Sequence, residues 1–268
     1  MDSNAKAARD LRRLAAFRLG VSEAHVLAFP ERLLEAEQLT RLQVDVDDLR
    51  KGRPAAYIFG EVPFLDWDFT VDERALIPRP ETEALADWVR RRIAARPPQK
   101  ILDLCCGSGV LGLALGKSFP EAQVTLTDLS EPALGLCQEN AARLEMTTRT
   151  RILAGDLFGA ISAPETFDLI VANPPYVAED DRVEQGVLGH EPHLALYSED
   201  SGMAHIKAIL DGLDAHMAAG GLAAFELGHN HQDLLDPWLK DRFPGKNTGW
   251  VADPFGVLRF LFYDSGTV

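Results

Sequence analysis

The chain has 268 residues, of which 46% are hydrophobic, and this is enough for one large or two ordinary domains with a substantial core. Its formal net charge of -14 weighs against a large surface for duplex DNA and favours protein or small-molecule partners. No apolar run approaches the roughly 20 residues of a membrane span, and the N-terminus lacks the apolar segment of a signal peptide. Three cysteines cannot form a disulfide framework and suit a reducing compartment. From these features together we expect a cytoplasmic protein without membrane attachment.

Residues 1–56 have the spacing of amphipathic helices, with Leu11 and Leu14 on one stripe, and predict a small helical domain. Ser22 and Asp45 each fit the start of a helix in this region. The first helix also carries a basic run. We interpret this run as a solvated helix face rather than a nucleic acid contact, because two aspartates dilute it.

Residues 57–75 differ in character, since aromatic and branched residues surround Gly60 and Pro63, and they predict a β-hairpin that links two domains. We expect residues 76–268 to form the second domain. Pro80 suits the first turn of a helix there, and the glutamates that follow complement the helix dipole. This helix start therefore has a local cause, and nothing in its chemistry requires a functional role.

A short buried strand over 100–104 leads into a glycine-containing loop and a helix that begins near Val110. The loop consists of Cys105, Cys106, Gly107, Ser108 and Gly109. Its glycines let the backbone approach a ligand, and the helix presents unpaired N–H groups, so we predict a cofactor loop. The cysteines are interpreted as small residues rather than nucleophiles, since no histidine lies beside them. Gly112 stands where a dinucleotide-binding loop has its third glycine, which leaves a dinucleotide as the alternative cofactor.

Acidic residues follow the next two predicted strands. The strand over 123–127 ends in Asp128, about 20 residues beyond the loop, where a Rossmann-like unit places an acceptor for ribose hydroxyls. The strand over 151–153 leads to Asp156 and Leu157, and Asp156 is placed to accept a hydrogen bond near an adenine. Ligand sites in open α/β sheets lie at the carboxyl ends of the strands, so these residues should share one site with the loop.

The buried strand over 167–171 ends in a rigid polar tetrapeptide: Asn173, Pro174, Pro175 and Tyr176. The prolines forbid further strand pairing and hold the carbonyls of Asn173 and Pro174 at set angles. Together with the Asn173 side-chain oxygen and the Tyr176 ring, they could grip a planar NH2 group. We expect the NH2 group of Asn173 itself to donate to backbone or cofactor. The tetrapeptide resembles the signature of amino-group methyltransferases that use S-adenosylmethionine, so we predict that these four residues are catalytic.

The rest of the chain continues the alternation of an open α/β sheet. We expect helices over 203–218 and 232–239, a strand over 222–227 and a closing pair of strands within 250–263. Two histidine groups, at 190–193 and 229–231, lack a recognised ligand spacing, and we therefore expect no metal site.

With these motifs identified, the chain is similar to the protein-(glutamine) methyltransferases that modify translation release factors, the PrmC (HemK) family. The similarity covers most of the chain and depends mainly on Ile-Pro-Arg-Pro-Glu-Thr-Glu at 77–83 paired with Asn-Pro-Pro-Tyr at 173–176. The family usually has Gly-Thr or other small residues where this chain has two cysteines. An aromatic residue often precedes its Glu-Pro, where this chain has His190.

The resemblance implies a class I S-adenosylmethionine-dependent methyltransferase fold, which is Rossmann-like with seven strands, the last antiparallel. It further implies that the loop residues 105–109, Asp128, Leu157 and Asn173 contact S-adenosyl-L-methionine. Residues 173–176 would hold the target glutamine, which in release factors is that of the Gly-Gly-Gln motif. We expect the N-terminal helical domain to recognise the protein substrate, because it contributes none of the cofactor motifs.

Three alternatives stay open. A ribosomal-protein glutamine methyltransferase differs mainly in the segment 77–83 and the N-terminal domain. A DNA adenine amino-methyltransferase uses similar chemistry on a flipped base but should carry a basic target-recognition domain, which the sequence lacks. A cofactor-binding structural protein would leave the rigid tetrapeptide unexplained.

Overall fold

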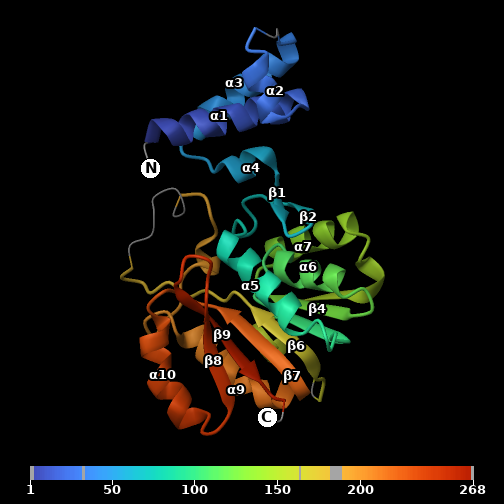
Figure 1. The fold of residues 1–268 in the computed structure, drawn as a ribbon, viewed down its shortest axis with the longest axis vertical. Helices are drawn as coiled ribbons and strands as arrows, with labels where there is room; N and C mark the ends of the chain where they lie inside the picture. Colours follow the sequence, from blue (N-terminus) through green and yellow to red (C-terminus); the bar gives the residue numbers. More distant parts are fainter. Residues whose placement is uncertain (1–2, 32–33, 163, 182–188, 267–268) are drawn as a thin grey trace.

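The N-terminal region is helical, as predicted. The computed structural model describes residues 3–31, 34–162, 164–181 and 189–266. Within them, the N-terminal helices are α1 (Ser3–Leu19), α2 (Glu23–Ala28), α3 (Ala36–Arg50) and α4 (Ala55–Phe59). Figure 1 shows α1 to α3 at one end of the molecule, with α4 between them and the sheet. The helix cap predicted at Ser22 is confirmed, because its hydroxyl accepts a hydrogen bond from the His25 N–H.

The helix start predicted at Asp45 is wrong. Asp45 lies inside α3 and is buried, and Arg18 of α1 donates from Nη2 to its Oδ1 at 2.8 Å. The helix begins at Ala36 instead, where the Gln38 side chain accepts a hydrogen bond from the Glu35 N–H. Since a buried carboxylate needs a partner, Asp45 serves to hold α3 against α1.

The predicted hairpin consists of β1 (Glu61–Phe64) and β2 (Trp67–Thr70), which pair in antiparallel fashion. Residues 57–59, which we assigned to the hairpin, lie instead in α4, and Gly60 ends that helix in the left-handed conformation at φ 74°. Phe64 and Phe69 are buried in the main core. The hairpin therefore packs onto the larger part of the molecule, while the domain boundaries at 56 and 75 remain a prediction.

A seven-stranded sheet forms the centre of the described chain. Its strands are β3 (Lys100–Leu104), β4 (Gln123–Asp128), β5 (Thr150–Ala154), β6 (Phe167–Ala172), β7 (Met217–Glu226), β8 (Asn247–Ala252) and β9 (Leu258–Asp264). Their order is β5-β4-β3-β6-β7-β9-β8, and β9 alone runs in the direction opposite to the other six strands. This confirms the predicted mixed sheet with an antiparallel last strand. One difference is that β7 starts at Met217, earlier than predicted, because the helix before it ends at His216.

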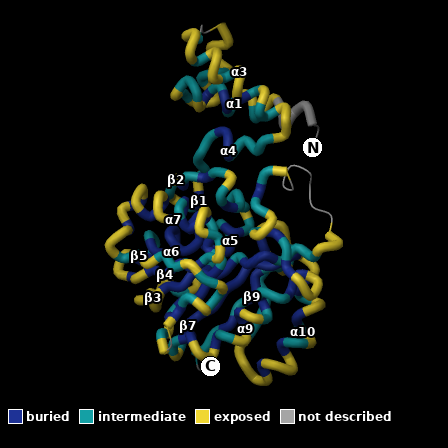
Figure 2. The backbone as a smooth tube through the Cα atoms, turned by 180° about the vertical axis from the view of Figure 1, so that it is seen from behind, coloured by how far each residue is buried: buried dark blue, intermediate teal, exposed yellow. Residues whose placement is uncertain are grey.

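Helices cover both faces of this sheet. They are α5 (Pro80–Arg92), α6 (Val110–Ser118), α7 (Glu131–Arg143), α9 (Ala204–His216) and α10 (His231–Arg242), with short 3-10 turns at 147–149, 157–160 and 193–195. The first three helices pack with the hairpin on one face, and α9 and α10 pack on the other. In Figure 2 the strands form a buried layer between the partly exposed helices.

The central strand β6 shows why helices cover both faces of the sheet. Leu169 and Val171 point into the core beneath α5 to α7, whereas Ile170 and Ala172 point into the core beneath α9 and α10. A strand that is apolar on both faces is typical of a parallel sheet covered by helices. The predicted tetrapeptide follows the carboxyl end of this strand.

Candidate active site

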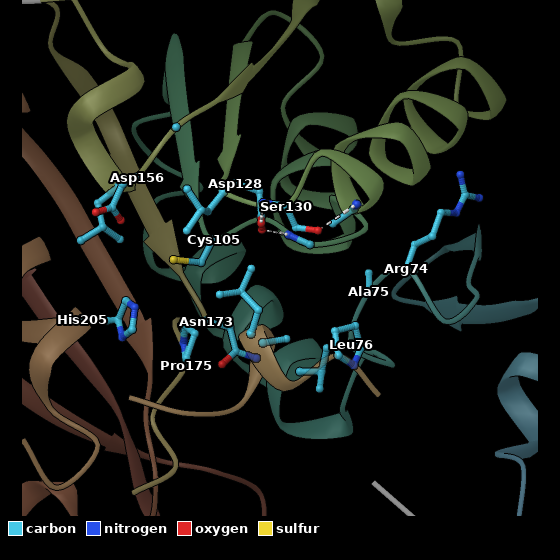
Figure 3. A pocket seen from close by; sticks show the side chains of 18 residues that line it. Arg74, Ala75, Leu76, Cys105, Asp128, Ser130, Asp156, Asn173, Pro175 and His205 are labelled. Carbon is cyan, nitrogen blue, oxygen red and sulfur yellow. Dashed lines mark hydrogen bonds between the residues drawn. The ribbon is translucent and has the colours of Figure 1, made fainter. Parts of the chain in front are cut away.

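A cavity lies at the carboxyl ends of β3, β4, β5 and β6, with about 720 Å³ of empty space including its mouth. It is of a size that suits a nucleoside-like ligand. Of the predicted site residues, the cavity brings together Cys105, Gly107, Asp128, Asp156, Leu157, Asn173 and Pro175. Figure 3 shows Asp128 and Asp156 at one side of this space and Asn173 at another. The predicted residues that do not line it are Cys106, Ser108, Gly109, Pro174 and Tyr176.

The loop after β3 turns sharply beneath the cavity. The backbone of Cys105 has φ 55°, a left-handed conformation that residues other than glycine rarely adopt. Gly107 and Gly109 are also left-handed. Cys106 points away from the cavity into the core, beside Cys137. A Cβ atom on Gly109 would lie 2.5 Å from Cys137 Sγ, so only glycine fits there. Cys106 and Gly109 thus shape the loop from below.

Asp128 links this loop to the next helix. Its Oδ2 accepts a hydrogen bond from the Gly107 N–H at 2.8 Å, and its Oδ1 accepts one from the Ser130 N–H at 2.9 Å. Figure 3 shows Asp128 and Ser130 meeting beside the cavity. Each carboxylate oxygen can accept a further bond, so Asp128 both orders the loop and remains an acceptor for a ligand.

Gly112, which allowed a dinucleotide as the alternative cofactor, has a packing role. It lies in α6, and its N–H donates to the buried Asp103 at 2.8 Å. A Cβ at this position would lie 2.7 Å from the Asp103 Cβ. Glycine at this position therefore permits close packing of α6 on β3, and this packing explains the residue without a bound ligand.

Asn173 lines the cavity and is held from behind by α5. Its Nδ2 donates to Thr82 Oγ1 at 3.2 Å, so one partner of the NH2 group is a side chain that we did not expect. Tyr176 lies further back, where its hydroxyl donates to Glu226 Oε1 at 3.4 Å. Burial raises the pKa of the Tyr176 hydroxyl, and it raises the pKa of Glu226 to about 7.

The segment before α5 contributes more than the local helix start that we inferred. Glu191 is buried, and its Oε1 accepts from Arg79 Nη2 at 2.6 Å while its Oε2 accepts from the Ile77 N–H at 3.0 Å. These bonds hold the segment with Pro192 and Leu194 over the cavity. No periodicity in the sequence indicated this contact. The only signal was the resemblance of residues 77–83 and Glu191-Pro192 to a family motif.

The cysteines and histidines near the cavity do not form a metal site in the described chain. Within residues 3–31, 34–162, 164–181 and 189–266, no three histidine, cysteine or acidic side chains are grouped as metal ligands would be. Burial raises the pKa of the Cys105 thiol, so it stays protonated near pH 7 and is a poor nucleophile. Among the same residues, no helix is long and apolar enough to cross a membrane.

The residues around the cavity fit S-adenosylmethionine. The carboxylates of Asp128 and Asp156 can accept hydrogen bonds from ribose hydroxyls and an adenine amine, and Leu129 and Leu157 offer apolar surface for a base. The acidic lining also suits a ligand that carries a sulfonium cation. Asn173 lines the same cavity.

Comparison with known proteins agrees with this arrangement. Residues 2–60 match the model of the PrmC N-terminal domain, and residues 82–190 match that of the methyltransferase small domain. The release factor glutamine methyltransferase of Koribacter versatilis is 37% identical over 92% of this chain and 88% of its own length. That of Bordetella pertussis is 38% identical over 86% of this chain and 85% of its own length.

A solved structure shares the fold at lower identity. The 16S rRNA N2 G1207 methyltransferase of T. thermophilus, solved with AdoMet and guanosine, aligns with a TM-score of 0.53 at 19% identity, over 76% of this chain and 49% of its own. Since the two curated relatives match nearly end to end, the family is established by sequence. The chain belongs to the release factor glutamine methyltransferase family, and it is an S-adenosylmethionine-dependent methyltransferase of class I fold.

Proposed function

We propose that this protein methylates the side-chain amide nitrogen of the Gly-Gly-Gln glutamine in peptide chain release factors. The observation that carries the proposal is the position of Asn173, which lines the cofactor cavity while its NH2 group is engaged by Thr82. We assign its Oδ1, the other end of the amide, to the substrate, because a substrate NH2 group requires an acceptor. The names of relatives that match most of the chain point to the same substrate.

Acceptors are required because the nitrogen of a glutamine amide is a poor nucleophile. When bound, S-adenosylmethionine supplies the methyl group on a sulfonium, which needs no metal activation. We assign Asn173 Oδ1, at the cavity, and the carbonyl of Pro174, just outside its lining, to accept hydrogen bonds from the two N–H groups of the substrate. These bonds hold the substrate nitrogen in line with that methyl group. Both acceptors would also stabilise the positive charge that develops on nitrogen as the N–C bond forms and the S–CH3 bond breaks, with its electron pair left on sulfur as a neutral thioether. The N–H proton leaves afterwards to solvent.

Tyr176 and the prolines contribute shape. Pro174 and Pro175 have fixed φ and no N–H, so no donor competes for the neighbouring carbonyls. We assign the ring face of Tyr176, rather than its hydroxyl, to the plane of the substrate amide. The hydroxyl has its own partner in Glu226.

We assign substrate recognition to the N-terminal helical domain, residues 1–56. The described helices there take no part in the cavity, and they lie at the far end of the molecule in Figure 1. Exposed apolar side chains on them, such as Leu27, Phe29 and Val44, offer surface for a protein partner. Release factors act in the cytoplasm, so the proposed substrate locates the protein there.

The test is methyl transfer from labelled cofactor to a panel of purified acceptors. The panel contains release factors, a release factor whose Gly-Gly-Gln glutamine is changed to alanine, ribosomal protein and duplex DNA. We expect label only in the release factors with an intact glutamine. Label in ribosomal protein or DNA, with none in release factors, would replace this function by one of the alternatives.

A further inference from the structure

We propose that His205 is a cofactor-binding residue, which recognises the adenine of S-adenosylmethionine through a hydrogen bond from its Nε2–H group to a ring nitrogen of the base. His205 lines the cavity, and the mechanism described above does not use it. The inference concerns how the cofactor is held, so it does not depend on which molecule receives the methyl group.

The fold brings His205 to the cavity from the helix α9. This helix connects the parallel strands β6 and β7, so it runs back along the sheet and begins at the edge where these strands have their carboxyl ends. His205 is the second residue of α9 and therefore lies at that edge. Its side chain is half-buried, which leaves part of it accessible to a ligand.

The helix α9 packs on the segment that carries Asp156. Phe158, two residues after Asp156, stacks on His216 of α9 with the ring centroids 4.6 Å apart. A Cβ atom on Gly212 of the same helix would lie 2.5 Å from Phe158 Cδ2, so the helix and the segment are in direct contact. Figure 3 shows His205 and Asp156 on the same side of the cavity. These two side chains are therefore placed to meet the same part of a ligand.

Ser198 fixes the orientation of the imidazole ring. Its hydroxyl oxygen lies 2.7 Å from His205 Nδ1, and it also accepts a hydrogen bond from the His205 backbone N–H at 3.3 Å. Ser198 is buried, and its own N–H donates to the Val177 carbonyl at 2.9 Å, so it is a fixed partner. Nε2 is the outer nitrogen of the ring, and in the described chain no residue forms a hydrogen bond with it. It is not a buried atom either, so a ligand can reach it.

The contact with Ser198 also decides which ring nitrogen carries the proton. A serine hydroxyl has one proton to donate, and within the described ranges the acceptor that it meets is His205 Nδ1. We assign this bond as donation from Ser198 to Nδ1, which places the proton of the neutral imidazole on Nε2. The outer nitrogen then presents a donor to the cavity.

This donor complements the acceptor that Asp156 provides. One edge of adenine has an amine, which donates hydrogen bonds, and a ring nitrogen on either side of the amine, N1 and N7, which accepts them. Asp156, which we predict to accept from the amine, cannot bind those nitrogens, because an ionised carboxylate has no proton to give. Recognition of this edge needs a donor next to the carboxylate, and His205 Nε2–H is such a donor.

The test measures by calorimetry the Kd of S-adenosylhomocysteine, which carries the same adenosine, on the full chain. His205→Phe keeps a flat ring but removes the donor, and His205→Gln keeps an N–H group near the position of Nε2. We expect the Kd to be about tenfold higher in His205→Phe, as for loss of one hydrogen bond, and less than about threefold higher in His205→Gln. A wild-type Kd in His205→Phe would overturn the inference.

Analogues of the ligand distinguish a direct contact from a change in the shape of the cavity. The 1-deaza and 7-deaza analogues of S-adenosylhomocysteine each replace one ring nitrogen of the base by carbon. The wild type should bind one of them about tenfold more weakly than the parent compound, whereas His205→Phe should bind that analogue and the parent equally. If the wild type binds both analogues as well as the parent, or if His205→Phe discriminates against each analogue as the wild type does, His205 acts through packing alone and the inference fails.

Discussion

Asn173→Asp is the sharpest test of the acceptor mechanism, because it keeps the shape and one oxygen of the side chain. In the wild type, Nδ2 donates to Thr82 Oγ1 at 3.2 Å. The substitution replaces the donor that faces Thr82 Oγ1 with a second, negatively charged oxygen that can only accept. A mismatch of this kind costs about 1–3 kcal/mol, or about 5- to 150-fold in rate.

Two further variants calibrate this result. Asn173→Ala removes the pre-organised acceptor altogether and should lower the rate by roughly 100-fold or more, the magnitude for loss of one pre-organised hydrogen bond in an oxyanion hole. Tyr176→Phe should be mild, because its ring is retained and the bond lost to Glu226 is long at 3.4 Å. The assay is single-turnover methyl transfer at saturating cofactor. Wild-type rates in Asn173→Ala would refute the mechanism and leave the tetrapeptide as a turn.

The remaining predictions concern the cofactor, the protein substrate and stability. Asp128→Ala should weaken cofactor binding, measured by calorimetry, by about 1.5–3 kcal/mol; Asp128→Asn is the matched control, because it retains the oxygen that accepts from the Gly107 N–H. Deletion of residues 1–50 should spare cofactor binding but reduce methylation of intact release factor, and equal activity of the two proteins would contradict the assignment of the N-terminal domain. Burial raises the pKa of Asp103 to about 8, so the folded state holds its proton from about pH 4 to 8 while the unfolded state loses it. The free energy of unfolding should therefore fall as pH rises through this range, by up to about 1.4 kcal/mol per unit of pKa shift, and Asp103→Asn should weaken that dependence.

The deletion must end before the hairpin for a physical reason. Phe64 and Phe69 are buried in the main core, and Asn140 of α7 holds the backbone of Thr70 by bonds of 2.8 and 3.0 Å. A deletion through residue 72 would remove these side chains and open the core. Loss of activity in such a protein would report on stability rather than on recognition.

Hydrophobic periodicity, together with the residue types at the ends of helices and strands, predicted most of the fold. The strand before Asn173 is apolar on both faces, and the strand that ends in Asp128 follows the loop at the expected distance. The strand order at this end of the sheet, and the position of these residues beside the cavity, therefore follow from local pattern. The error at Asp45 arose because a short acidic residue before an apolar one fits a helix start equally well in isolation. Its partner Arg18 is far away in sequence, and no local rule indicates that ion pair.

The features of the candidate site that could not be predicted from the sequence depend on contacts between segments that are distant in the chain. Residues 77–83 fit a helix start, and only the folded chain shows that Arg79 and Ile77 bind Glu191 and that Thr82 binds Asn173. Cys106 stands within the loop that we predicted to bind the cofactor, yet its side chain faces the core because the loop turns at Cys105. Which way a loop residue points depends on a backbone conformation that composition does not determine.

The most direct test of the central claim is to locate the added methyl group. Full-length release factor is incubated with the protein and S-adenosylmethionine, digested, and mapped by mass spectrometry with fragmentation of the Gly-Gly-Gln peptide. We predict one methyl group on the side-chain amide nitrogen of that glutamine, and none after incubation with Asn173→Ala for the same time. A methyl group on any other residue, or an unmodified glutamine under conditions where the protein methylates another acceptor, would contradict the account.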